Sequence, residues 1–216
     1  MKVELVAITV GAGKLIEHNA QEVIGYITRV SNPSNQMNFD TVDKLLAYCI
    51  TNNHWSPFEH ASFTVEIVTS RAIGAQILRH RSFKFQEFSQ RYAAVATVEK
   101  YPARSQDLKN RQNSKDDMSD QDKAWFDDAQ QEVWERAYDK YKEALAKGVA
   151  KEQARFLLPL ATTTTMYMTG DVRCWIHYIE LRSAHGTQKE HQDIAIECKR
   201  VFTEQFPDVA KALNWV

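Results

Sequence analysis

The sequence has few cysteines, and their arrangement rules out several kinds of site. Three occur among 216 residues, Cys49, Cys174 and Cys198, and no two of them form a CxxC pair. This spacing argues against a disulfide framework and against a zinc site of paired cysteines. Each cysteine falls in a helical stripe, so we expect a small core hydrophobe at each position. A reducing compartment fits this usage best.

A large net charge and a long hydrophobic run are also missing. The chain carries 27 basic and 28 acidic residues, for a net charge of −1. A general nucleic-acid coat would be more basic, so any cluster of cations is a local feature. The N-terminal 13 residues are too short and too alternating for a signal peptide or a membrane span. We therefore expect a cytoplasmic protein with no membrane partner.

The residue pattern predicts an α+β fold, a mostly antiparallel sheet with many helices, in a single domain over 1–216. Alternating or β-branched runs predict strands at 2–10, 61–69 and 162–169. The G-A-G at 11–13 lacks the third glycine and the acidic residue of a dinucleotide fingerprint. Residues 103–123 have almost no apolar content and are predicted to be a polar surface insertion. Helices are predicted at 14–30, 41–53 (N-cap Asp40), 71–81 (N-cap Ser70), 121–147, 152–158, 172–185 (opened by Gly170 and Asp171, closed at Gly186), 189–205 and 208–215.

The densest group of chemically active side chains lies between Gln76 and Tyr92. Arg79, His80 and Arg81 follow an apolar helical run directly. Arginines this close repel one another, so a folded protein usually keeps them beside an anion, and phosphate suits the forked guanidinium. Gln76 and Arg79 are three residues apart and would share a helix face, where they could hold a uracil-like ring or a phosphate.

The residues after this cluster suggest a phosphate seat. If 87–91 is extended, Glu87, Ser89 and Arg91 point the same way, with neighbouring backbone N–H groups between them. Ser89 has no evident base partner in the sequence, so we interpret it as a phosphate ligand and not as a nucleophile.

These residues resemble the motif of flavin-dependent thymidylate synthases, in which R-H-R is followed after seven residues by S-x-R. Three further segments are similar to segments of that family and come in the same order. They are H-W-S-P-F-E-H at 54–60, R-F-L-L-P-L at 155–160 and W-I-H-Y-I-E-L-R-S-A-H-G-T-Q-K-E-H at 175–191. The resemblance spans about 31–191, most of the chain.

The resemblance implies a homotetramer whose FAD and dUMP sites are built by several subunits. NADPH would reduce FAD, methylenetetrahydrofolate would supply one carbon, and dUMP would become dTMP, with Arg182 as the activating, catalytic residue. The dUMP ligands implied are Gln76, Ile77, Leu78, Arg79, Glu87, Phe88, Ser89, Gln90, Arg91, Arg155 and Arg182. The FAD ligands implied are Ser31, His54, Ser56, Glu59, Arg79, His80, Arg81, Glu87, Asp171, Arg173 and His177.

The chemistry of the implied roles is coherent. Uracil C5 is a poor nucleophile, and a guanidinium aimed at N3 and O4 stabilises the negative charge that activates it. Arginine cannot be the base at neutral pH, so Arg182 is interpreted as an electrostatic activator. No cysteine nucleophile is required. No metal is expected, because the spacing of His185 and His191 fits no common helical ligand pair.

The sequence departs from the family at two positions, where many members carry asparagine and this chain has Asp171 and His177. A carboxylate beside a pyrophosphate is unfavourable unless Arg173 pairs with it or it meets the adenine or ribose instead. Arg173 and His177 are four residues apart and share a helix face. Arg173 and Arg182 are nine apart and face opposite ways on a straight helix. Either the helix ends or bends before Arg182, or it serves two active sites at a subunit interface, and we favour the second as a hypothesis.

Two other functions remain open from the residues alone. A nucleic-acid-binding module could use the Arg/aromatic cluster at 79–92, with Phe83, Phe85, Phe88 and Tyr92 as stacking partners. The near-neutral net charge, with Glu59 and Glu87 beside the cluster, argues against it. The second alternative is a regulatory protein that has the same fold and binds a nucleotide but has no catalytic turnover.

Overall fold

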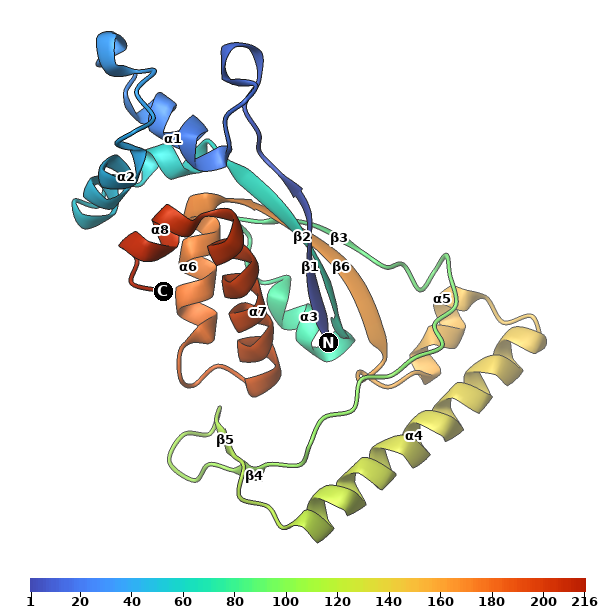
Figure 1. The fold of residues 1–216 in the computed structure, drawn as a ribbon. Coiled ribbons are helices and arrows are strands. Elements are labelled where there is room, and N and C mark those ends of the chain that lie inside the picture. Colours follow the sequence, from blue (N-terminus) through green and yellow to red (C-terminus); the bar gives the residue numbers. More distant parts are fainter.

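The fold is built on one antiparallel sheet of four strands, and the computed structural model describes all residues 1–216. The strand order is β1-β2-β6-β3, and every neighbouring pair is antiparallel. Figure 1 shows these strands running side by side through the middle of the molecule. The strands are β1 (Lys2–Ile8), β2 (Ser62–Ser70), β3 (Lys84–Glu87) and β6 (Thr163–Asp171), with a separate pair β4 (Ser105–Gln106) and β5 (Ser114–Lys115).

The alternating residues of β2 divide the sheet into a buried and an open face. Phe63, Val65 and Ile67 point into the core and have an exposure of 1% or less. On the opposite face the Tyr167 hydroxyl donates to a Glu66 carboxylate oxygen at 2.8 Å, and Tyr167 is exposed. This is the period-two pattern that the sequence predicts for a half-buried strand.

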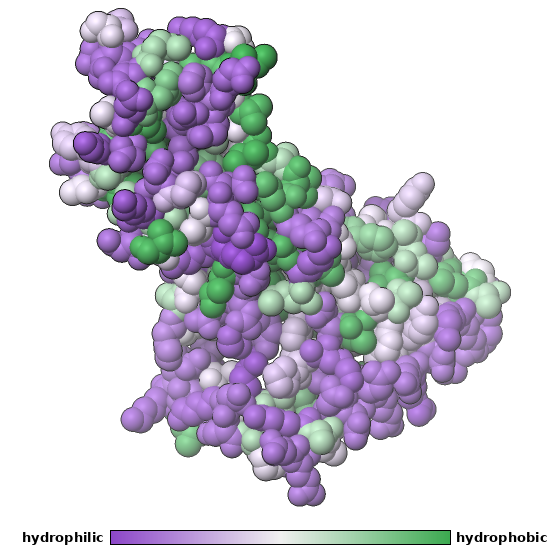
Figure 2. Space-filling view, in the orientation of Figure 1, coloured by the Kyte–Doolittle hydropathy of each residue, from purple (hydrophilic) through white to green (hydrophobic).

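Three helices cover the buried face of the sheet, and a fourth lies far from it. Figure 1 shows α6 and α7 side by side against the sheet with α3 beside them, whereas α4 lies at the opposite end of the molecule. In Figure 2 the region around β4, β5 and α4 is mostly hydrophilic. No helix combines the length and apolar character needed to cross a membrane. The helices are α1 (Ala20–Thr28), α2 (Val42–Thr51), α3 (Arg71–Ile77), α4 (Asp120–Ala146), α5 (Lys151–Ala154), α6 (Val172–Ser183), α7 (Lys189–Gln205) and α8 (Pro207–Ala212), with 3-10 turns η1 (Gly13–Leu15), η2 (Pro33–Asn35), η3 (Ser56–Glu59) and η4 (Arg155–Leu157).

Two N-caps bring α3 and α6 together. Ser70 ends β2 and caps α3, its hydroxyl accepting from the Ile73 N–H at 3.4 Å. Asp171 ends β6 and caps α6, its carboxylate accepting from the Cys174 N–H at 2.8 Å. Because β2 and β6 are antiparallel, the two helices start at opposite ends of the sheet and run back toward each other. Their C-terminal ends therefore meet over the sheet.

The N-terminal helices differ from their predicted bounds. The single helix predicted at 14–30 is wrong: a 3-10 turn is followed by α1, which begins at Ala20. Asn19 and Glu22 form a capping box there, with each side chain accepting from the other residue's backbone N–H, and this box fixes the start of the helix. The predicted Asp40 cap is also wrong, because Thr41 is the N-cap residue of α2.

The chain after α3 also departs from prediction. The helix expected over 71–81 ends at Ile77 and passes into turns, with the His80 N–H donating to the Ile77 carbonyl at 3.0 Å. The extended segment expected over 87–91 ends near Phe88. Beyond it the Tyr92 N–H donates to the Ser89 carbonyl at 3.0 Å, which makes a turn. Ser89 and Arg91 therefore do not continue the pleat of Glu87.

Candidate functional site

The C-terminal ends of α3 and α6 meet at a cavity of about 420 Å³. Gln76 comes from the end of α3, Arg79 from the turn after it, and Arg182 from the last turn of α6. The sequence predicted all three as nucleotide ligands, and the fold brings them together. The lining residues are Gln76, Arg79, Gln112, Arg182, Gly186, Thr187 and Gln188.

Arg182 is held by His80, a residue 102 positions away in the chain. The Arg182 Nε–H donates to His80 Nε2 at 2.8 Å, so that nitrogen must carry a lone pair and His80 must be neutral, with its proton on Nδ1. Burial, the charge of Arg182 and then His177 lower the pKa of His80 to about 4. His80 is therefore an acceptor that orients the guanidinium at neutral pH.

A buried pair lies behind His80. The Tyr178 hydroxyl and His191 Nε2 are 3.1 Å apart, and both residues are fully buried. The His80 ring packs edge-on against the Tyr178 ring, with centroids 4.8 Å apart. Burial, then the charges of Arg182 and His80, lower the pKa of His191 to about 3. Arg182 is thus backed by neutral, mutually packed rings.

A second cavity, of about 580 Å³, lies at the other end of α6 beside η3. Arg173 and His177 both line it, as their shared helix face predicted. Arg173 pairs with the Glu59 carboxylate and not with Asp171, whose carboxylate is occupied by capping α6. The lining residues are Trp55, Glu59, Ser82, Asp171, Arg173, Cys174, Ile176, His177 and Glu180.

One continuous helix separates the two cavities. Because α6 extends unbroken from Val172 to Ser183, the alternative in which the helix ends before Arg182 is excluded. Arg173 and Arg182 line different cavities, as opposite faces of a straight helix require. Whether both faces contact other subunits stays a prediction.

The rest of the predicted nucleotide set lies outside the Arg182 cavity. Glu87 accepts from the Thr164 hydroxyl at 2.8 Å and pairs with Arg71 at 3.4 Å, near the start of α3. Arg91 is exposed and pairs with Glu152 at 3.1 Å. Arg155, in η4, also does not line that cavity. The expected phosphate-binding site, with Glu87, Ser89 and Arg91 on one face, is therefore not formed within the protomer.

Other predicted contact residues are scattered or inaccessible. Ile77 has no exposed surface. The Phe88 N–H is bonded to the Thr165 carbonyl at 2.8 Å, so it has no donor left for a ligand. The Gln90 side chain is buried, and its Nε2 has no partner. Ser31 lines a separate cavity of about 490 Å³ beside Arg29. Leu78, Ser89, His54, Ser56 and Arg81 are exposed.

Sequence reasoning missed several lining residues. Trp55, Ser82 and Glu180 lie within or beside motifs that the sequence displays, and only the fold shows that they face a cavity. Gln112 comes from the polar segment 103–123, which carries no motif. Cys174 is also not the core hydrophobe expected: it is partly buried, lines the second cavity, and its Sγ lies 3.3 Å from an Asp171 oxygen.

The aromatic stacking surface required by the nucleic-acid alternative is not present. Phe83 is 4% exposed and packs on Trp175, with centroids 4.8 Å apart. Phe85 and Phe88 are partly buried, whereas Tyr92 is 86% exposed. A single exposed ring does not make the row of stacking partners that single-stranded nucleic acid needs.

Comparison with known proteins identifies the relatives of this chain. The family described as "Thymidylate synthase complementing protein" matches residues 14–208. A probable flavin-dependent thymidylate synthase of Paramecium bursaria Chlorella virus 1 is 55% identical over 200 residues, covering 92% of this chain and 93% of the viral protein. The flavin-dependent thymidylate synthase of Synechocystis sp. is 54% identical over 193 residues, covering 89% of each chain.

A solved structure has the same fold. The UMP/dUMP methylase PolB from Streptomyces cacaoi, bound with 5-Br dUMP, superposes with a TM-score of 0.80. It is 23% identical, and the match covers 99% of this chain and 94% of the other. At this identity the likeness is evidence for the fold alone.

Proposed function

Because the chain belongs to the family of flavin-dependent thymidylate synthases, we propose that it converts dUMP to dTMP by reductive methylation. Methylenetetrahydrofolate is the carbon donor, FAD is the bound cofactor and NADPH is the reductant. The observation that carries this proposal is the cavity in which Arg182, oriented by a neutral histidine, lies beside Gln76 and Arg79.

Arg182 would activate the uracil ring. A guanidinium has five N–H donors, and His80 takes only the one on Nε. The four N–H groups on the terminal nitrogens remain for the ligand, and they suit the negative charge that develops on N3 and O4 when C5 becomes nucleophilic. Arg79, on the same cavity wall, adds positive charge that suits a nucleotide phosphate.

The second cavity fits part of an FAD molecule. Arg173 is half exposed there, with four of its five N–H groups not involved in the hydrogen bond to Glu59, and it suits a pyrophosphate. Asp171 turns its carboxylate to the backbone of α6, which reduces the repulsion expected from an acid at that position. His177 offers a donor or acceptor to the adenine end. When bound and reduced, the flavin would supply the hydride that completes the methyl group.

We infer that the site is completed by other subunits of a homotetramer. Glu87, Ser89, Arg91 and Arg155 are implied dUMP ligands, yet none of them lines the Arg182 cavity. A neighbouring subunit that brings its own copies of these residues to the cavity mouth would complete the set. The oligomeric state and the shared site can be tested together by mixing Arg182→Ala protomers with Arg91→Ala protomers, because hybrid assemblies should regain activity.

The reaction would need no cysteine nucleophile. No cysteine lines the Arg182 cavity. Burial raises the pKa of the Cys49 thiol and of the Cys198 thiol, and both residues are closed off from solvent. Burial also raises the pKa of Cys174, on the other side of α6. Replacing all three by serine or alanine should leave a measurable rate of dTMP formation.

The direct test is spectroscopic and catalytic. Purified protein should show the flavin absorbance bands, or acquire them with added FAD, and should form dTMP from dUMP, methylenetetrahydrofolate and NADPH. Protein that takes up no FAD, or FAD-loaded protein that forms no dTMP under these conditions, contradicts the proposal.

A further inference from the structure

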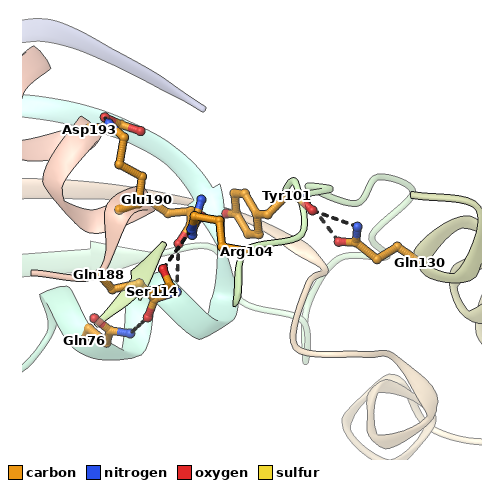
Figure 3. A network of polar contacts seen from close by, with 9 residues as sticks. Gln76, Tyr101, Arg104, Ser114, Gln130, Gln188, Glu190 and Asp193 are labelled. Atoms are coloured by element: carbon orange, nitrogen blue, oxygen red, sulfur yellow. Dashed lines mark hydrogen bonds and ion pairs between the residues drawn. The ribbon is translucent and has the colours of Figure 1, made fainter. Parts of the chain in front are cut away.

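A chain of polar contacts leads from the nucleotide cavity to the β4–β5 pair, as Figure 3 shows. The Gln76 amide nitrogen donates to Gln188 Oε1 at 2.6 Å, and the Gln188 amide nitrogen donates to Glu190 Oε2 at 2.9 Å. Arg104 donates through one terminal nitrogen to Glu190 Oε1 and through Nε to the Ser114 hydroxyl at 2.9 Å. This hydrogen-bonded network therefore extends from α3, past the start of α7, to the β4–β5 pair.

The carboxylate of Glu190 lies in the middle of this network and is its charged acceptor. Its side chain is 6% exposed, and that of Arg104 is 16% exposed. Burial alone would raise the pKa of Glu190. Hydrogen bonds from Arg104, from Gln188 and from its own backbone N–H outweigh burial and hold the pKa below its ordinary value. Glu190 is thus an ionised group that only accepts hydrogen bonds.

The negative charge of Glu190 sets the orientation of both side-chain amides in this network, those of Gln188 and Gln76. Because Glu190 only accepts, Gln188 must turn its NH₂ toward it and its Oε1 toward Gln76. Gln76 must then turn its own NH₂ toward Gln188. The Gln76 Oε1 and one remaining N–H are left for a ligand in the cavity that Arg79 and Arg182 also line.

We infer that Glu190 and Gln188 are positioning residues for dUMP, acting through Gln76 and anchored by Arg104. This inference rests on the proposed function and adds to it two residues that touch neither the reacting atoms nor the Arg182–His80 pair. Without the carboxylate, the side-chain amide of Gln188 can flip by about 180°. The Gln76 amide then no longer has a fixed orientation that presents its oxygen and one N–H to the cavity.

The test is a double-mutant cycle in the FAD-loaded enzyme. Glu190→Gln should raise KM for dUMP by about tenfold, the effect of one misplaced hydrogen bond, while kcat changes by less than about twofold. In a Gln76→Ala background the same substitution should raise KM no further, because the group that it positions is gone. The matched control is Glu204→Gln, which removes a carboxylate from an exposed pair with Arg200 on the same helix and should leave both constants unchanged.

Two results would overturn the inference. One is an additive cycle, in which Glu190→Gln raises KM equally with and without Gln76. The other is a lower kcat at unchanged KM, which indicates a loss of folded protein. Affinity for dUMP measured by calorimetry gives the same cycle without turnover. A wild-type enzyme that binds dUMP but forms no dTMP would therefore count against the proposed function alone.

Discussion

Acidification should destabilise this protein, and about half of the effect should come from one buried ring, His191. The folded protein lowers the pKa of His191 from 6.5 to about 3, because no exposed surface remains and Arg182 and His80 lie nearby. The unfolded chain binds a proton below about pH 6.5 while the folded chain does not, so stability falls as pH drops through this range. Between about pH 7 and about pH 5 the loss is about 2 kcal/mol, since each unit below 6.5 costs about 1.4 kcal/mol.

This loss is large against a typical stability of about 5–15 kcal/mol. Urea unfolding at fixed protomer concentration, repeated between about pH 5 and about pH 8, measures it. His191→Gln retains a partner for the Tyr178 hydroxyl, and His191→Phe retains the ring volume, yet neither titrates. Both variants should lose about half of the combined pH dependence, because His80, whose pKa falls to about 4, contributes nearly as much between about pH 7 and about pH 5. If both variants retain the full wild-type slope, the assignment to His191 is refuted.

Three further outcomes follow from the two cavities. Arg182→Ala should retain FAD, seen by absorbance, yet lose dTMP formation by at least about 100-fold, as expected for removal of one charge-stabilising donor; unimpaired turnover would contradict its role. Arg173→Ala should weaken FAD binding in an equilibrium titration while dUMP affinity stays within about twofold, and equal losses for both ligands would argue against separate cavities. Asp171→Ala should lower the free energy of unfolding by about 1 kcal/mol through loss of the α6 cap, whereas Asp171→Asn should restore most of it.

Local signals in the sequence predicted the fold well where one residue determines a boundary. Ser70 is a helix cap as expected, α6 begins directly after Asp171, and α7 spans Lys189–Gln205 as predicted. The alternation at 61–69 predicted β2 to within a residue. The error at 14–30 was avoidable, because Asn19 followed by Glu22 is a capping-box pattern. The mostly antiparallel α+β fold and the family are confirmed.

The site was predictable only in part, because much of it depends on long-range contacts. The opposite phases of Arg173 and Arg182 follow from helix geometry alone, and the structure separates them accordingly. The pairing of Arg182 with His80 joins two motifs that local periodicity cannot relate. The turn at Ser89 was missed because the residue pattern does not encode where β3 leaves its neighbour β6, which itself continues to Thr163.

The unbroken course of α6 fixes the spacing of the two cavities that Arg173 and Arg182 line. At 1.5 Å per residue, the nine steps from Arg173 to Arg182 fix their separation along the axis at about 13 Å. Inserting or deleting a single residue between them would turn Arg182 by about 100° relative to Arg173 and displace it from His80. The number of residues between Arg173 and Arg182 is therefore more constrained than the identity of those residues. Proteins that bind the same pair of ligands should keep this spacing even where the residues of the helix differ.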